Sequence, residues 1–277
     1  MNFSDLVENS FNGQSLLRFL KEQMPSCSNK RLKAFLEAGS VKINGMIERF
    51  GSKRVFQGDL VQFVSKKIPI SSSICILYED DNFLAINKPV NFESSQLNLN
   101  RSFPSSYLVH RLDKNTTGVL LIAKNKNFQK YLEDLFRTKK IQKKYVALID
   151  GVLTKDHITI KSHLVRKKVY QGQAIWGSSN SLAGLYAETH LKKLKIFDDF
   201  SLVELSPITG RTHQLRVHLK ELGHPILGDF QYCRKFRTTK DVLCLCLHSS
   251  EVSFEHPITN EHLTIKAPLP DAFSLIK

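Results

Sequence analysis

The feature that most constrains the fold is a series of short, apolar, strand-like runs that no regular succession of helices interrupts. From residue 74 onward, helical spacing of apolar residues appears within residues 128–136 and 215–222. Strands and helices do not alternate steadily, and no internal repeat is found. The sequence therefore predicts an α+β domain over residues 74–277, with a mixed, largely antiparallel β-sheet and packed helices. The predicted strands are Ile74–Tyr78, Phe83–Asn87, Gly118–Ala123, Lys144–Ile149, Leu202–Leu205 and Val242–His248.

A smaller α/β domain is predicted over residues 13–65, ahead of a short linker at 66–73. Its first helix is expected to end before Pro25, because proline cannot continue a helix. Its second helix is expected to begin at a Ser28 cap and to stop at Gly39, since glycine readily takes the left-handed geometry that ends helices. The expected β elements are Val41–Ile43 leading into an Asn44-Gly45 hairpin turn, and a strand pair within Val55–Val64.

The charge balance of the chain is strongly basic. Forty Lys and Arg residues oppose 26 Asp and Glu residues, which gives a formal net charge of +14. In the small domain, Lys30, Arg31 and Lys33 are candidates for binding phosphate groups of a nucleic acid. A basic face can equally be an ordinary solvated surface, and an anionic membrane would also attract it. Charge alone therefore does not identify the partner.

The sequence contains no secretory signal and no apolar run long enough for a membrane helix. Its five cysteines form no Cys-x-x-Cys pair. Cys244 and Cys246 could join His248 at a metal ion, but two buried thiols on one strand face are the simpler interpretation. We therefore expect a cytoplasmic protein with no membrane partner and no bound metal.

Candidates for chemistry lie in three polar clusters. Residues 110–118 run directly into the apolar strand 119–123, residues 143–145 begin another strand, and residues 210–218 open a helix. The sequence has no dinucleotide-binding, Walker, zinc-protease or nucleophile-elbow motif. Each polar residue taken singly could be a turn, surface or salt-bridge residue. Polar loops held by a rigid sheet nevertheless often form functional sites.

Taken together, these clusters resemble the RluA-type RNA pseudouridine synthases. The resemblance covers most of residues 74–277. A looser one connects the small domain with the ribosomal-protein-type RNA-binding module that often precedes such synthases. The matching motifs are, in chain order, Tyr78–Pro89, His110-Arg111-Leu112-Asp113 with Thr116–Gly118, Lys143–Ala147, Gly210-Arg211-Thr212-His213-Gln214-Leu215-Arg216-Val217-His218 and Gly223–Asp229.

The resemblance implies an enzyme that breaks the N-glycosidic bond of a uridine in RNA, rotates the uracil and rejoins it through carbon, without a metal or organic cofactor. Asp113 is the implied catalytic carboxylate, which attacks the sugar carbon or removes a neighbouring sugar proton. Arg216 is expected to pair with it, and Tyr145 to stack near the base and help remove the carbon-bound proton. Arg111 is a candidate for contacting the RNA backbone or filling the space that the flipped base leaves. The other candidates for substrate binding are His110, Arg211, His213 and Gln214.

The sequence departs from the family pattern at a few places. Val90-Asn91 follows Lys88-Pro89, where the family usually has a small residue and then Gly. Asn tolerates left-handed backbone better than most residues, so the loop can be retained. Thr117 stands where Ser is commoner. Residues 92–106 and 170–186 match no family pattern and are expected to be loops or insertions.

Structured RNA is the partner that this resemblance implies, and a monomer is expected. Large-subunit ribosomal RNA is favoured because the RNA-binding module is common in the ribosomal branch of the family, with transfer RNA as the alternative. A glycosidase would also attack a sugar–base bond, but it usually needs a second placed carboxylate, which the three clusters lack. A catalytically inactive RNA-binding protein is the other alternative, and the intact Asp113, Tyr145 and Arg216 argue against it.

Overall fold

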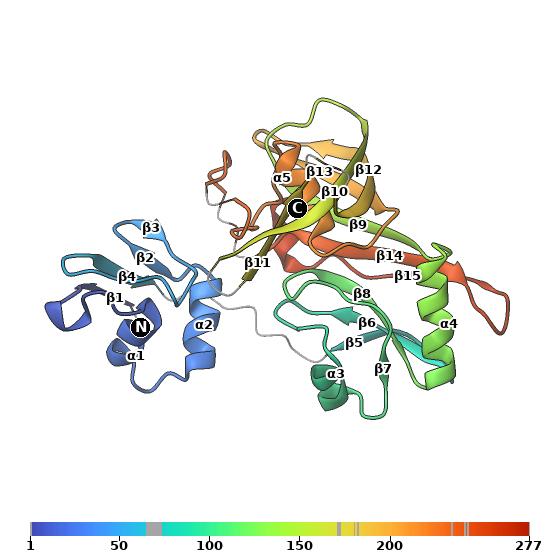
Figure 1. Cartoon of the computed structure of the whole chain (residues 1–277), viewed down its shortest axis with the longest axis horizontal. Helices are drawn as coiled ribbons and strands as arrows, with labels where there is room; N and C mark the ends of the chain where they lie inside the picture. Colours follow the sequence, from blue (N-terminus) through green and yellow to red (C-terminus); the bar gives the residue numbers. More distant parts are fainter. Residues whose placement is uncertain are drawn as a thin grey trace. The chain divides into compact units, whose positions relative to one another are not determined.

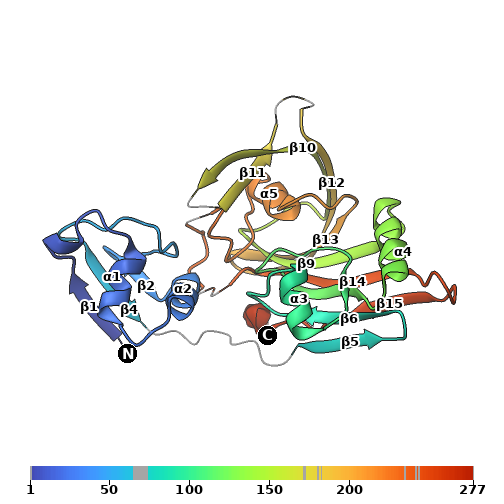
Figure 2. The same ribbon diagram turned by 60° about the horizontal axis from the view of Figure 1, so that its bottom comes forward.

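The computed structural model describes residues 2–64, 74–170, 173–179, 181, 183–233, 235–240, 242 and 244–276. The chain divides into two compact units, Met1–Ile70 with Val169–Ala174 and Ser71–Lys168 with Ile175–Lys277. Each unit contains a β-sheet and a buried hydrophobic core of its own (Figures 1 and 2). The predicted linker at 66–73 lies outside the described residues.

The first unit packs α1 and α2 on a four-stranded sheet of order β1-β4-β2-β3 (Figure 1). Ser15 and Ser28 cap the two helices, since their hydroxyl oxygens accept hydrogen bonds from the backbone N–H groups of Arg18 and Arg31. Asn44-Gly45 forms the predicted hairpin turn, with both residues at positive φ. The elements are β1 (Asn2–Leu6), η1 (Asn9–Phe11), α1 (Leu16–Gln23), α2 (Asn29–Glu37), β2 (Val41–Ile43), β3 (Met46–Ile47) and β4 (Leu60–Val64).

Two features of this unit differ from the sequence prediction. Strand β1 lies upstream of residue 13 and pairs antiparallel with β4. None of its side chains is fully buried, and its sequence lacks the apolar alternation that predicts a strand. The predicted strand pair within Val55–Val64 is wrong, because only Leu60–Val64 is a strand. The carboxylate of Asp59 accepts a 2.9 Å hydrogen bond from the N–H of Phe56 and closes a turn there instead.

The second unit is built on an 11-stranded sheet of order β11-β10-β12-β13-β9-β14-β8-β6-β5, with β15 beside β14 and β7 beside β8. Among the pairings described, β14 with β8 is parallel and the others are antiparallel. The predicted α+β fold with a mixed, largely antiparallel sheet is therefore confirmed. The strands are β5 (Cys75–Glu79), β6 (Phe83–Lys88), β7 (Tyr107–Leu108), β8 (Thr117–Ala123), β9 (Gln142–Asp150), β10 (His157–Tyr170), β11 (Gln173–Ser178), β12 (Leu185–Ile196), β13 (Phe200–Pro207), β14 (Leu247–Glu255) and β15 (His262–Lys266). The helices are α3 (Gln96–Ser102), α4 (Lys126–Arg137), α5 (Gln214–Glu221) and η2 (Asp271–Ile276).

Two buried elements give the second unit its rigid centre. Every residue of β8 is buried, as its unbroken apolar run predicts for a strand covered on both faces. Helix α5 places Leu215 and Leu219 in the core that β9 and β13 also form. His213, just ahead of α5, has a φ of 56°. The polar clusters at 110–118 and 210–218 therefore adjoin a fully buried strand and a buried helix.

Three stretches of this unit differ from the loops and strand bounds that the sequence predicted. Residues 92–106 contain α3, a polar helix that buries only Leu99 and so lacks an apolar stripe. Residues 170–186 contain β11 and parts of β10 and β12 rather than a loop. Strand β14 begins at Leu247, and the described residues between 242 and 246 lie outside any strand.

Gly118 permits the close approach of β8 to β14. Its φ is +107°, and a Cβ at this position would collide with the backbone of Ser249. Gly118→Ala is therefore expected to lower the free energy of unfolding by more than about 2 kcal/mol, because left-handed backbone alone costs an Ala roughly 1–2 kcal/mol. Gly223→Ala is the matched control, with a φ of +87° and no heavy atom within 4 Å of the added Cβ. Urea unfolding measures both, and equal losses would contradict the packing argument.

Candidate active site

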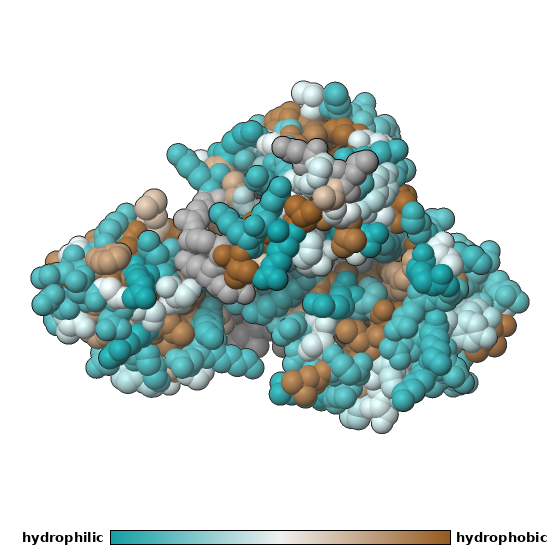
Figure 3. Space-filling view, in the orientation of Figure 1, coloured by the Kyte–Doolittle hydropathy of each residue, from teal (hydrophilic) through white to brown (hydrophobic). Residues whose placement is uncertain are grey.

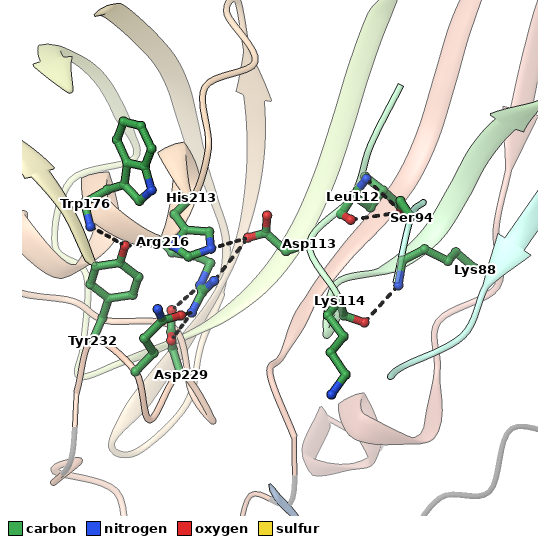
Figure 4. A network of polar contacts seen from close by, with 11 residues as sticks. Lys88, Ser94, Leu112, Asp113, Lys114, Trp176, His213, Arg216, Asp229 and Tyr232 are labelled. Carbon is green, nitrogen blue, oxygen red and sulfur yellow. Dashed lines mark hydrogen bonds and ion pairs between the residues drawn. The ribbon is translucent and has the colours of Figure 1, made fainter. Parts of the chain in front are cut away.

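Asp113 stands in the loop between β7 and β8, and both of its neighbours are fixed. The buried Ser94 hydroxyl donates a 3.0 Å hydrogen bond to the carbonyl of Leu112 and accepts a 3.3 Å one from its N–H. Lys88, buried at the end of β6, donates from Nζ to the carbonyl of Lys114 at 3.0 Å. Figure 4 shows Ser94 and Lys88 on the side of the loop opposite Arg216. The Asp113 carboxylate is therefore presented from a preorganised backbone.

Lys88 also organises the turn that follows β6. Its Nζ donates to the carbonyls of Pro89 and Phe92 at 3.0 and 2.9 Å, which with Lys114 gives one acceptor for each ammonium hydrogen. Burial lowers the pKa of Lys88 to about 7, and the charge of Asp113 opposes this shift. Asn91 in this turn has a φ of 63°, so the tolerance expected of Asn at this position is confirmed.

Arg216 on α5 joins two carboxylates. Its Nε and Nη2 donate to the two oxygens of Asp229 at 2.8 Å each, and its Nη1 donates to Oδ2 of Asp113 at 3.2 Å. Nη2 also donates to Oε1 of Gln231 at 2.6 Å, and the guanidinium carbon lies 5.0 Å from the centre of the Tyr232 ring. The predicted pairing of Arg216 with Asp113 is present, but the two-pronged contact is made with Asp229 (Figure 4).

Arg216, Asp229 and Asp113 form an ion triad, and the charge of each residue affects the other two. Burial alone would lower the pKa of Arg216, but Asp229 and then Asp113 raise it above its ordinary value. The guanidinium is therefore charged and attracts both carboxylates. Both oxygens of Asp229 are occupied by Arg216, and its side chain is only 2% exposed. Asp229 is thus not a free second acid of the kind that a glycosidase requires.

A series of polar contacts connects β11 with Asp113. The backbone N–H of Trp176 donates to the hydroxyl of Tyr232 at 3.0 Å, and this hydroxyl lies 2.8 Å from Nδ1 of His213. Burial, and next the charge of Arg216, lowers the pKa of His213 to about 4, so its ring is neutral near pH 7. Within the described residues, Nδ1 is the acceptor available for the Tyr232 hydrogen. The hydrogen of His213 then lies on Nε2, which faces Oδ2 of Asp113 at 3.9 Å.

Asp113 opens into a pocket that side chains from all three polar clusters line. Tyr145 projects into it from β9, and burial raises the pKa of Tyr145 to about 12, against the opposing effect of the Ser249 hydroxyl. Tyr145 is therefore a neutral phenol near pH 7. The polar and aromatic residues that line the pocket are Arg111, Asp113, Thr116, Lys143, Tyr145, Thr209, Arg211, His213, Gln214 and Arg216.

Two residues predicted to bind substrate are instead engaged by the protein. Nε2 of His110 accepts a 2.9 Å hydrogen bond from the N–H of Leu121, and burial lowers the pKa of His110 to about 3. The ring does not line the pocket. The amide of Gln214 accepts from Thr209 and Arg211 and donates twice to β12, which satisfies its full hydrogen-bonding capacity. The amino-acid sequence does not reveal this burial. We assign structural roles to His110 and Gln214.

The remaining predicted residues fall into two places. Arg111 and Arg211 are exposed at the pocket, and Nε of Arg211 donates to the carbonyl of Tyr186 at 3.0 Å. Lys30, Arg31 and Lys33 belong to α2 of the first unit, where all three are exposed. In the part of the chain that the structure describes, no group of three or more His, Cys, Asp or Glu side chains could hold a metal ion. No helix among these described residues is long and apolar enough to cross a membrane.

The sequence motifs and the geometry can be compared with known proteins. A family model for RNA pseudouridylate synthase matches residues 82–221, a stretch that contains Asp113, Tyr145 and Arg216. The chain belongs to the RNA pseudouridylate synthase family. It is 31% identical to ribosomal large subunit pseudouridine synthase D of Pasteurella multocida, over 94% of this chain and 89% of that protein. It is 32% identical to ribosomal large subunit pseudouridine synthase C of Yersinia pestis, over 93% and 89%.

Solved structures of family members have the same fold. Human RNA pseudouridylate synthase domain containing 1 matches with a TM-score of 0.59 and 29% identity, over 71% of this chain and 83% of that one. Human RNA pseudouridylate synthase domain containing 4 matches with a TM-score of 0.60 and 28% identity, over 72% and 90%. The chain is thus an RNA pseudouridine synthase by family and by fold.

Proposed function

We propose that this pseudouridine synthase acts on uridine in large-subunit ribosomal RNA, with Asp113 as its catalytic carboxylate. The observation that carries the proposal is the Asp113 carboxylate, bound by buried Arg216 and opening into a pocket with Tyr145. The relatives from Pasteurella multocida and Yersinia pestis are ribosomal large subunit enzymes, which supports ribosomal RNA over transfer RNA. We further propose that the enzyme works as a cytoplasmic monomer, as expected from the sequence.

The contacts of Asp113 favour one of its oxygens as the reacting atom. Arg216 and His213 both approach Oδ2, whereas Oδ1 has no partner among the described residues. Oδ1 is therefore free to attack the sugar carbon or to remove a neighbouring sugar proton. Positive character builds at the sugar carbon as the N-glycosidic bond breaks, and an ionised carboxylate beside it stabilises that charge.

Tyr145 and Arg111 complete the proposed site. The neutral Tyr145 ring can stack near the uracil, and its hydroxyl can exchange a hydrogen bond with the base. Its raised pKa keeps it a neutral phenol in the free enzyme, so it can take up the carbon-bound proton only if another acceptor takes the phenolic proton. Arg111 is exposed at the pocket and suits the RNA backbone or the space vacated by the flipped base.

We propose a division of labour in which residues 13–65, extended upstream by β1, supply RNA affinity and residues 74–277 supply the chemistry. Hydrophilic residues predominate on the visible face of the first unit in Figure 3. Lys30, Arg31 and Lys33 are exposed on α2, and Ser28 fixes the start of that helix. Because phosphate contacts dominate nonspecific RNA affinity, this face suits binding more than catalysis.

Replacement of Asp113 tests the catalytic proposal. Asp113→Asn keeps the side-chain shape but removes the reactive anion, so the single-turnover rate should fall by at least about 100-fold while RNA affinity persists. Release of tritium from RNA labelled at uracil carbon five measures the rate, with ribosomal and transfer RNA compared as substrates. Asp81→Asn, at an exposed acid, is the control. A rate in Asp113→Asn within a few-fold of wild type would rule out the assignment, and free uracil as the product would indicate a glycosidase.

The basic face of α2 is tested in the full-length chain by replacing Lys30, Arg31 and Lys33 together with Ala. Binding should weaken, and the slope of log affinity against log salt should flatten by about 0.7–0.9 for each RNA phosphate that the variant no longer neutralises. The rate at saturating RNA should change little. Replacement of the exposed Lys126, Lys130 and Lys139 by Ala removes the same charge elsewhere. An equal effect of the two triple variants would show that only net charge matters.

A further inference from the structure

Lys143 and Lys144, near the start of strand β9, lie in different surroundings. The Lys144 side chain is 42% exposed, and its Nζ lies 2.9 Å from Oε1 of Glu251. Lys143 instead lines the pocket with Tyr145, as expected because residues two apart share a face of a strand. One lysine therefore makes an ordinary surface ion pair, while its neighbour faces the site of the reaction.

The Lys143 side chain is half-buried, and no protein anion among the described residues pairs with its ammonium group. Burial lowers the pKa of Lys143 to about 8, and no acceptor for its Nζ is found in the described ranges of the chain. Nζ lies 3.8 Å from the point where a Cβ on Gly210 would stand, so the ammonium lies beside the third polar cluster. Leaving a partly desolvated charge unpaired is costly, and the position is explained if the substrate supplies the partner.

The other charges of the pocket point to an anionic partner. Arg216 is already matched by Asp229 and Asp113. The pocket lining adds Arg111, Lys143 and Arg211 without a further acid, which leaves an excess of positive charge. Uracil and ribose are neutral, whereas every nucleotide brings one phosphodiester anion. An RNA phosphate is therefore the group that fits this excess.

We propose that Lys143 binds a phosphodiester flanking the target uridine and so holds the flipped nucleotide over Asp113. This inference rests on the proposed action on RNA uridine. In it Lys143 contacts substrate inside the pocket of the second unit, whereas the basic face of α2 belongs to the first unit. Lys143 thereby positions one nucleotide of the RNA.

The test compares Lys143→Met with Lys144→Met, which removes the same charge one residue away. Lys143→Met should weaken RNA binding several-fold and reduce the slope of log affinity against log salt by about 1, while Lys144→Met should leave the slope unchanged. RNA with a neutral methylphosphonate at either linkage flanking the target provides the matching change in the substrate. One such linkage should weaken binding to wild type and to Lys144→Met, but not weaken binding to Lys143→Met any further. Lys143→Arg should restore part of the affinity.

The outcomes separate this inference from the function on which it rests. If wild type and Lys144→Met release tritium but Lys143→Met keeps the full salt slope, or remains sensitive to both methylphosphonates, the phosphate contact is refuted and the proposed function stands. If wild type releases no tritium from uridine-labelled RNA, the proposed function itself fails. Thermal unfolding of each variant shows whether it is folded, and Lys143→Arg supplies the comparison if Lys143→Met is not.

Discussion

A single buried guanidinium organises the active site. Arg216 holds Asp229 with two parallel hydrogen bonds and Asp113 with a third, and it lies over the ring of Tyr232. A charge removed from water must be compensated nearly completely, so the helix, the segment after Ile226 and the catalytic loop must come together correctly around it. The bidentate contact fixes the plane of the guanidinium. The third bond can then orient Asp113 while Oδ1, the oxygen that we propose to react, stays unoccupied.

Further polar contacts fix the position of the Asp113 loop. Ser94 and Lys88 fix the backbone on the two sides of the carboxylate, and the buried strand β8 fixes where the loop ends. Tyr232 gives neutral His213 a defined tautomer, so an N–H faces Oδ2. Preorganised polar groups of this kind lower the cost of reorganisation during the reaction. The buried residues Lys88, Ser94, Arg216 and Asp229 thus support one carboxylate.

Much of this could be predicted from the sequence, for identifiable reasons. An unbroken apolar run predicts strand β8. Apolar spacing that stops at Pro25 predicts α1, and the Ser28 cap with its apolar spacing predicts α2. Strands β10 and β12 escape detection because lysines punctuate them and much of their surface is exposed. Helix α3 buries a single leucine and has no apolar stripe to reveal it.

Some features of the candidate active site could likewise be predicted from the sequence, and others could not. The pairing of Arg216 with Asp113 follows from the resemblance, but the stronger hold of Asp229 on Arg216 does not. The buried roles of Gln214 and His110 depend on burial, which the order of residues does not display. Lys143 and Lys144 are identical in type and adjacent in sequence, and only the pleat of β9 tells them apart. Residue type thus predicts which side chains are candidates for catalysis or binding. Packing determines which of these candidates face the pocket and which are buried in hydrogen bonds within the protein.

We propose that Asp229 acts on the reaction by holding Arg216 against Asp113. A double-mutant cycle of Asp229→Asn and Arg216→Lys, read as the single-turnover rate of tritium release at saturating RNA by folded enzyme, tests it most directly. Each single variant should lower the rate strongly with little change in RNA affinity. The double variant should be no slower than the slower single one, because both changes remove the same positioning. A near-normal rate for Asp229→Asn, or fully additive losses in the double variant, would contradict the account.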